Sequence, residues 1–217
     1  MLEILFIRHG ETDWNKNRRI MGGRPVPLNR EGIKQAEETA KSLDSIEIKA
    51  VYTSPLKRTI QTARILAKGR SVRVVEVPEL VEIDYGDWVG KTFDEVSRYP
   101  AFKLYHTNPA KAQAPRGERM KDVWQRGVRW VEMMRKEHRK GRIMAVSHAD
   151  VIKVILTHYM NLDLNEMLRM RIDNAAVSIL WLNGKSSGVF GINCHTNLEK
   201  VFSRTDQLYP LPNSTKK

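Results

Sequence analysis

The chain has 217 residues, 41% of them hydrophobic, which is enough to bury one core, so we expect a single domain over residues 1–217. The single cysteine, Cys194, excludes an internal disulfide. No apolar run approaches the roughly 20 residues that span a bilayer, and the N-terminal apolar run is too short for a signal peptide. We therefore expect a cytoplasmic protein without membrane contact. The net charge of +12 would suit a nucleic-acid binder, but basic and acidic residues are interleaved and no nucleic-acid-binding motif is present, so we expect no nucleic-acid partner.

The first part of the chain alternates strand and helix patterns, which is typical of an α/β fold with a largely parallel sheet. The apolar run from Leu2 to Ile7 predicts the first strand. Asn29 is a favoured helix cap, and the helix after it, over residues 30–43, places apolar residues on one face: Ile33, Ala36, Ala40 and Leu43. We expect this face to pack on the sheet.

A second strand is expected at residues 49–54, followed by a helix over residues 55–68 that starts with a proline. Residues 71–77 predict a third strand. The pattern then loosens over residues 84–117, where prolines leave room for one short helix at residues 92–98. Because a long irregular insertion in a compact domain usually forms a lid or binding loops, we expect residues 84–117 to be a lid.

The last part of the chain returns to regular patterns. Residues 118–140 predict a long amphipathic helix, and the almost continuously apolar run Arg142–Ser147 suits a central strand. The remaining expected elements are a helix, a closing pair of strands and a loose tail: residues 149–160, 175–182, 187–195 and 205–217.

Charged and polar side chains follow the expected strands where each strand ends. The first strand ends in Arg-His-Gly at residues 8–10, the second leads to Arg58 in the first turn of its helix, and the central strand ends in Ser-His-Ala at residues 147–149. Glu82 follows the third strand. Ligands of open α/β sheets bind beyond the carboxyl ends of the strands, so these side chains are expected to share one site.

These residue types suit phosphoryl transfer. The guanidiniums of Arg8 and Arg58 stay charged and match phosphate oxygens. A neutral nitrogen of His9 can attack phosphorus and form a phosphohistidine, while Glu82, with a raised pKa, can protonate the leaving oxygen and later deprotonate water. A cationic His148 would add charge to the transferring group, so the chemistry needs no metal ion.

Taken singly, each residue has an ordinary explanation: His148 as a hydrogen-bonded structural histidine, Arg58 as a surface charge. Their joint appearance at strand ends favours a site. Gly10 is expected to let the backbone turn tightly and approach the ligand. No His-x-His or His-x-x-x-His pair occurs, so no metal site is expected.

Four segments resemble the motifs of the histidine phosphatase superfamily, which has the phosphoglycerate mutase-like fold: FIRHGETDWN, YTSPLKRTIQTA, VEIDYGDWVGKT and AVSHADVIK. PLNREGIKQA and PRGERMKDVWQR are similar to further family segments, so the resemblance covers most of residues 2–182. It implies an α/β fold of three layers, α/β/α, with a mixed, mostly parallel central sheet and the lid above the active site.

The resemblance also implies roles for individual residues. His9 would be the phosphorylated nucleophile and Glu82 the proton donor. Arg8, Arg58 and His148 would form the phosphate pocket.

The same resemblance implies that three further residues contact the substrate. Asn15 would donate to the phosphate, and Gly22 and Ala149 would lie beside the substrate. The chain departs from the family at two places. Met21 stands where members often carry Gln, and Ala149 stands where Gly is common. Both departures bear on specificity rather than on the phosphoryl chemistry.

Two reactions remain open, because a phosphatase and a mutase share the first half-reaction. The region 84–117 is shorter than the corresponding part of cofactor-dependent mutases, and PRGER resembles the broad-specificity phosphatase branch. We therefore expect a metal-independent phosphomonoesterase of small phosphate esters, with a phosphoglycerate mutase as the alternative. Four cations in or near the lid would favour substrates with a second anionic group, or else serve solubility: Lys103, Lys111, Arg116 and Arg119.

No cofactor is expected, and the expected partner is a small phosphorylated metabolite. A homodimer is one option, since an edge strand at Ala176–Leu182 would pair across a two-fold axis.

Overall fold

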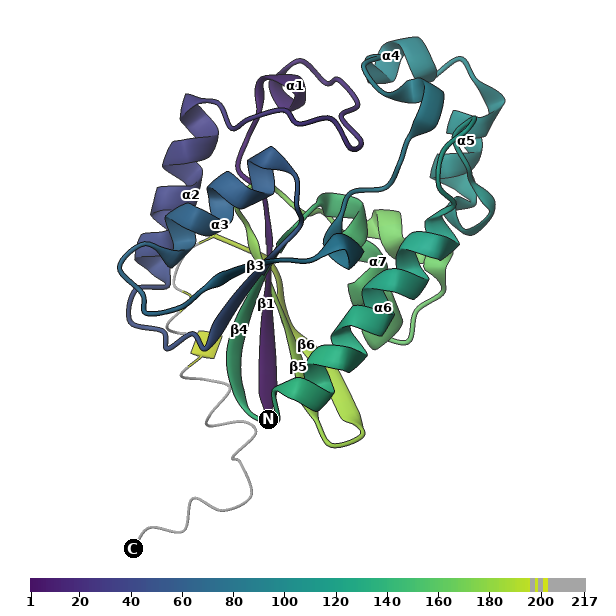
Figure 1. Ribbon diagram of the computed structural model, residues 1–217. Helices are drawn as coiled ribbons and strands as arrows, with labels where there is room; N and C mark the ends of the chain where they lie inside the picture. The colour runs from purple at the N-terminus through teal and green to yellow at the C-terminus, as the bar shows by residue number, and fades with distance from the viewer. Residues whose placement is uncertain (196–197, 199–200, 203–217) are drawn as a thin grey trace, which may run out of the picture.

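The computed structural model describes residues 1–195, 198 and 201–202; the expected tail at 205–217 lies outside the described residues. A sheet of six strands forms the centre, in the order β3-β2-β4-β1-β5-β6 (Figure 1). The strands are β1 (Leu2–Arg8), β2 (Ala50–Thr53), β3 (Val74–Glu76), β4 (Gly141–Ser147), β5 (Val177–Asn183) and β6 (Ser186–Cys194).

The first four strands of this order run parallel, and β5 and β6 are antiparallel to their neighbours. The sheet is therefore mixed and mostly parallel, as predicted, with β4 and β1 at its centre. The prediction of an edge strand at Ala176–Leu182 is wrong, because β5 pairs with β1 on one side and with β6 on the other. Its backbone groups are used within the sheet, so they cannot pair with a second copy.

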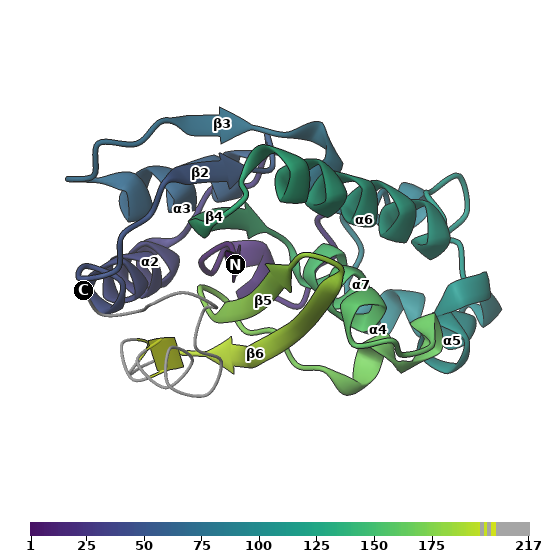
Figure 2. The same cartoon turned by 90° about the horizontal axis from the view of Figure 1, so that it is seen from below.

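Helices cover both faces of the sheet (Figures 1 and 2). One cluster of buried side chains joins the sheet to α2 and α3, and a second joins it to α6 and α7. The helices are α1 (Asp13–Lys16), α2 (Arg30–Ser42), α3 (Lys57–Ala67), α4 (Phe93–Val96), α5 (Pro100–Thr107), α6 (Met120–Glu137) and α7 (Ala149–Tyr159). No helix in the described part of the chain is long and apolar enough to cross a membrane.

Helix α2 packs with most of the predicted face. Ala36 and Leu43 are fully buried, and Ala40 packs against the core that contains Leu43. The prediction is wrong for Ile33, which is 39% exposed. Its neighbour Gly32 takes the inward position against the backbone of Glu11, where a Cβ would come within 2.0 Å of the Glu11 carbonyl oxygen.

The region 84–117 is more regular than predicted. It contains α4 and α5, and two short 3-10 helices, η2 (Gly86–Trp88) and η3 (Pro109–Lys111). Four of its residues form a small core together with Ile20 from the first loop: Trp88, Val96, Phe102 and Ala114. The aromatic side chains of this core hold the region together, and sequence pattern alone did not reveal it. Two further 3-10 helices, η1 (Pro78–Leu80) and η4 (Leu164–Arg169), connect other elements.

Candidate active site

Strand register brings the two predicted histidines together. Arg8 is paired with Ser147 across the parallel strands β1 and β4, so the residues that follow them leave the sheet side by side. The amide of His9 donates to the Ser147 carbonyl at 3.0 Å, and the rings of His9 and His148 have centroids 5.3 Å apart. The carboxyl ends of the central strands thus form the floor of a site.

A cavity of about 450 Å³ lies above this floor. Its wall contains six of the eight predicted site residues: Arg8, His9, Asn15, Gly22, Glu82 and Ala149. The other two, Arg58 and His148, have no exposed surface and lie beneath the wall. The structure therefore gathers all eight, and the region 84–117 contributes to the same cavity through Tyr85, Phe93, Tyr105 and His106.

His9 presents a lone pair on one defined nitrogen. Its Nδ1 lies 2.7 Å from the Gly10 carbonyl oxygen, and since a carbonyl only accepts, Nδ1 carries the proton. Burial lowers the pKa of His9 well below its ordinary value, and the charges of Arg58 and Arg8 lower it further. The ring is thus neutral, with Nε2 free to act as a nucleophile.

His148 is fixed on both ring nitrogens. Arg58 Nη2 donates to Nδ1 at 3.2 Å, so Nε2 carries the proton and donates to Ser54 Oγ at 2.8 Å. Burial, followed by the charge of Arg58, lowers the pKa of His148 well below its ordinary value. A bound phosphate dianion would offset the charge of Arg58, so a cationic His148 in the loaded site stays a prediction.

Arg58 is a buried cation and Arg8 a half-buried one, and both keep N–H groups that make no hydrogen bond in the described part of the chain. Arg8 Nη1 donates to the Ile172 carbonyl at 2.7 Å, and Arg58 Nη2 also donates to the Gly22 carbonyl at 2.9 Å. The Nε atoms of both are buried without a hydrogen-bond partner in the described part of the chain. Burial lowers the pKa of both guanidiniums, that of Arg58 to about 10. An anion fits this donor set.

Asn15 is oriented by its own loop. Its Oδ1 accepts from the Thr12 amide at 3.1 Å and from Thr12 Oγ1 at 3.0 Å. The Nδ2 group is therefore the part of Asn15 that can donate into the cavity. Gly22 has φ of +49°, a conformation that favours glycine, and this turn aims its carbonyl at Arg58.

Glu82 has the raised pKa that acid–base work at neutral pH needs. Burial raises the pKa of Glu82 to about 7, and the charge of Asp150 contributes in the same direction. Its Oε1 accepts from the Ile83 amide at 3.1 Å, and its Oε2 lies 4.0 Å from His148 Nδ1.

A linked group of polar cavity residues was not predicted from the sequence: Asp150, Tyr85 and Tyr105. Asp150 is 5% exposed and accepts hydrogen bonds from the hydroxyls of Tyr85 and Tyr105. Burial and the nearby Asp150 charge raise the pKa of both tyrosines well above the ordinary value. Asp150 follows His148 by two positions, so the rule that site residues follow the ends of strands could have included it. The irregular sequence pattern around Tyr105 gave no reason to select that residue.

Gly10 permits a close approach of two backbone segments, while its predicted approach to the ligand stays a prediction. A Cβ on Gly10 would lie 2.2 Å from the Gly32 carbonyl oxygen, so the close approach is to helix α2. The backbone of this loop is anchored by side chains: Thr62 accepts from the Gly10 amide at 3.1 Å, and Asn174 Nδ2 donates to the His9 carbonyl at 2.9 Å. Sequence pattern gave no sign of these anchors.

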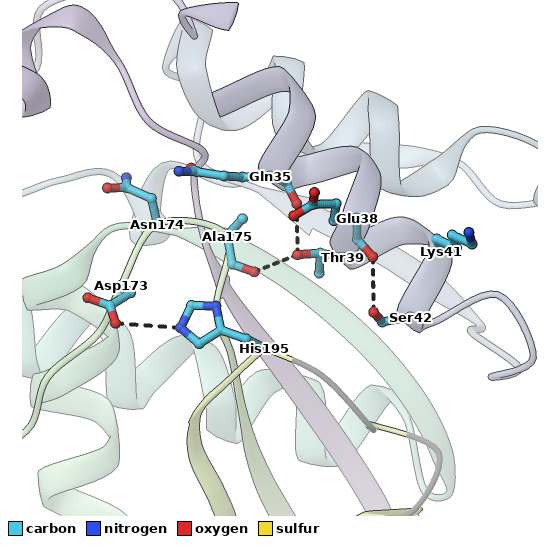
Figure 3. Close-up of a pocket in the computed structure, with 9 residues that line it drawn as sticks. All are labelled: Gln35, Glu38, Thr39, Lys41, Ser42, Asp173, Asn174, Ala175 and His195. Atoms are coloured by element: carbon cyan, nitrogen blue, oxygen red, sulfur yellow. Dashed lines mark hydrogen bonds and ion pairs between the residues drawn. The ribbon is translucent and has the colours of Figure 1, made fainter. Parts of the chain in front are cut away.

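A second cavity, of about 530 Å³, is lined by side chains of α2, residues 173–175 and His195 (Figure 3). Its wall includes Thr39, whose hydroxyl donates to the Ala175 carbonyl at 2.8 Å, and His195, whose Nε2 lies 3.5 Å from Asp173 Oδ2. Asn174 contributes to the walls of both cavities. The second cavity holds none of the predicted site residues.

The four lid cations do not line the active-site cavity. Arg116 pairs with Asp87 and Arg119 with Asp122, which explains two of them as surface ion pairs. The predicted preference for a second anionic group therefore does not rest on these residues. Different cationic or imidazole side chains line the cavity instead: Arg18, Arg19, His106 and Lys153.

Comparisons with known proteins identify relatives of this chain and its fold. Phosphoserine phosphatase 1 of Hydrogenobacter thermophilus is 30% identical over 199 residues, which cover 90% of this chain and 94% of that protein. Phosphoglycerate mutase-like protein 4 of Arabidopsis thaliana is 35% identical over 156 residues, 70% of this chain and 68% of that protein. The solved structure of Bacillus stearothermophilus YhfR is 31% identical, with a TM-score of 0.83 over 87% of this chain and 95% of that chain.

The family model of the histidine phosphatase superfamily (branch 1) matches residues 4–194, which include every predicted site residue. The chain therefore belongs to the histidine phosphatase superfamily, and it is a phosphatase of that superfamily.

Proposed function

We propose that this phosphatase hydrolyses small phosphate esters without a metal ion, through a covalent phosphohistidine on His9 and with Glu82 as general acid. The observation that carries the proposal is the neutral His9 ring, whose proton is fixed on Nδ1 by the Gly10 carbonyl. It leaves a nucleophilic nitrogen beside two guanidiniums, where a phosphoryl group would be held.

The first step transfers the phosphoryl group to the protein. Nε2 of His9 attacks phosphorus, the P–N bond forms as the ester P–O bond breaks, and Glu82 gives its proton to the leaving oxygen. Arg8 and Arg58 stabilise charge on the phosphoryl oxygens. A pKa near 7 leaves Glu82 largely protonated below neutral pH, as this step requires.

The second step returns the site to its starting state. Water attacks phosphorus, the Glu82 carboxylate takes a proton from the water, and the P–N bond breaks. Inorganic phosphate leaves, His9 is again neutral, and Glu82 is again protonated. One carboxyl group thus serves as acid and then as base.

The substrate class we propose is a small phosphate ester with a second anionic group. The cavity of about 450 Å³ has room for a metabolite-sized molecule, and Arg18, Arg19 and Lys153 in its wall suit a carboxylate. A relative is named phosphoserine phosphatase, so O-phosphoserine is the first ester to test.

The nucleophile is tested by His9→Ala, with phosphate release from p-nitrophenyl phosphate and O-phosphoserine as the measurement. We expect kcat to fall by roughly 10³-fold or more. The matched control is His195→Ala, because His195 lies at the second cavity (Figure 3); this variant should retain wild-type activity. Hydrolysis by His9→Ala at the wild-type rate would remove the phosphohistidine from the proposal.

The general acid is tested by Glu82→Gln with the same two esters. An alkoxide needs a proton to leave, whereas p-nitrophenolate leaves without one. The measurement is kcat/KM, because it reports the steps up to phosphoryl transfer and excludes the later hydrolysis step, which both esters share. The value for O-phosphoserine should fall by about 10²–10⁴-fold and that for p-nitrophenyl phosphate by much less. Equal losses for both esters would contradict the assignment of Glu82 as acid.

A phosphoglycerate mutase is the alternative, favoured by the mutase-like name of one relative. A mutase would pass the phosphoryl group to a hydroxyl instead of to water. Incubation with 3-phosphoglycerate and a priming bisphosphate, followed by ³¹P NMR, separates the two reactions: net phosphate release supports the phosphatase, and isomer interconversion without release supports the mutase.

A further inference from the structure

Asp150 is a buried carboxylate that the proposed chemistry does not use. It lies in the first turn of α7 and lines the active-site cavity together with Glu82. Its Oδ2 accepts from both the Tyr85 and the Tyr105 hydroxyl, and Lys153 Nζ lies 3.9 Å from its Oδ1. Two O–H donors, an ammonium group and the start of a helix thus surround the Asp150 carboxylate.

The two tyrosines belong to the lid region. Tyr85 stacks on Trp88, and Tyr105 stacks on Phe102, both in the small core of that region. Asp150 belongs to the floor, two residues after His148. One carboxylate therefore links the lid to the floor at the active site.

Glu82 is the less well stabilised of the two carboxylates. Its Oε1 accepts a hydrogen bond from one backbone amide, and its side chain is only 12% exposed. Two buried carboxylates in one cavity disfavour each other's ionisation, so the group with fewer donors takes the proton. The raised pKa of Glu82, caused by burial and then by the charge of Asp150, agrees with this reading.

We propose that Asp150 is a positioning residue that keeps Glu82 protonated and holds the lid against the floor through Tyr85 and Tyr105. The proposal rests on the proposed function of Glu82 as general acid. Titratable groups face Glu82 from several elements, and their combined effect decides its protonation: Arg8, His9, Arg58, Tyr85, Tyr105, His148 and Asp150. Arg8 and Arg58 favour its ionised form, and Asp150 opposes them.

The central test is Asp150→Asn, which removes the charge while its amide oxygen can still accept from both tyrosines. Without the charge the pKa of Glu82 falls, so the protonated acid is lost at lower pH. The alkaline limb of the pH profile of kcat/KM for O-phosphoserine should move down by about one pH unit. At pH values above the limb, kcat/KM should be roughly tenfold lower than in the wild type. Asp163→Asn, the same change at the cap of η4, is the matched control and should leave the profile unchanged.

The lid contact is tested separately by Tyr105→Phe, which keeps the Asp150 charge. We expect a severalfold rise in KM and no acid shift of the alkaline limb. Rescue is tested by Asp150→Glu, which retains a carboxylate and should move the limb back toward the wild-type position. An unshifted limb in Asp150→Asn, or no rescue by Asp150→Glu, would overturn the electrostatic role. An unchanged KM in Tyr105→Phe would overturn the lid contact.

A measurement without turnover separates this inference from the proposed function. In wild-type protein labelled with ¹³C at its carboxyl groups, the Glu82 resonance, assigned with Glu82→Gln, should titrate near pH 7. It should titrate at lower pH in Asp150→Asn. A Glu82 midpoint near its ordinary value in the wild type would overturn the inference even if Asp150→Asn failed to fold. Failure of every ester to be hydrolysed would instead overturn the proposed function.

Discussion

Fixed hydrogen-bond partners decide which nitrogen of each active-site imidazole carries the proton. The Gly10 carbonyl fixes His9, while Arg58 and Ser54 fix His148. The histidines could be predicted from the sequence because they follow directly after apolar strands. Ser54 could not be assigned a role, since a serine before a proline is an ordinary turn residue until the register of β2 and β4 places it beside His148.

Ser54→Ala tests this dependence at one atom. The buried Nε2–H of His148 would lose its acceptor, and an unsatisfied buried donor costs about 1–3 kcal/mol. We expect the free energy of unfolding, measured with urea, to fall by that amount, and kcat to fall with it. Ser97→Ala, an exposed serine in the lid, is the control and should change stability by less than about 0.5 kcal/mol. Equal stabilities for the two variants would contradict the role of Ser54.

At the scale of elements, α2 and the loop after β1 are in direct backbone contact. Gly10 and Gly32 permit that approach from opposite sides. The sequence predicted the helix and its Asn29 cap, and the cap bond to the Gly32 amide is present at 2.8 Å. It did not predict that Ile33 is exposed, because periodicity counts apolar residues and does not show where a close backbone approach requires a glycine. The lid helix α5 was missed for a related reason: its apolar side chains serve a small local core rather than the sheet.

Gly32→Ala should therefore separate α2 from the active-site loop. Its Cβ would meet Glu11 backbone atoms as close as 2.0 Å, which cannot be relieved by turning a side chain. We expect a loss of at least about 2 kcal/mol in the free energy of unfolding and a strong fall in phosphatase activity. The matched control is Gly23→Ala, because a Cβ there would meet nothing within 4 Å. A Gly32→Ala protein as stable and active as the control would show that the loop tolerates the displacement.

At the scale of the whole molecule, folding brings the guanidiniums of Arg8 and Arg58 into one anion-binding pocket. The unfolded chain lacks this pocket and binds anions more weakly. A ligand that binds only the folded state stabilises it, by about 2.7 kcal/mol at a concentration 100 times its Kd. For a domain of this size we expect inorganic phosphate to raise Tm by roughly 5–10 °C. Sodium chloride at equal ionic strength should give a much smaller shift, and Arg8→Gln should abolish the phosphate effect. An equal response to both salts would contradict a specific phosphate pocket.

The position of β1 in the sheet has a consequence for how the protein is made. β1 leaves the ribosome first, yet both of its neighbours, β4 and β5, lie more than 130 residues further along the chain. Pairings between such distant segments are slow to form, because the chain loses entropy when the long loop closes, and the strand contacts offset that cost only afterwards. β1 therefore stays without these sheet partners until β4 and β5 have been synthesised, and His9 gains its surroundings only then.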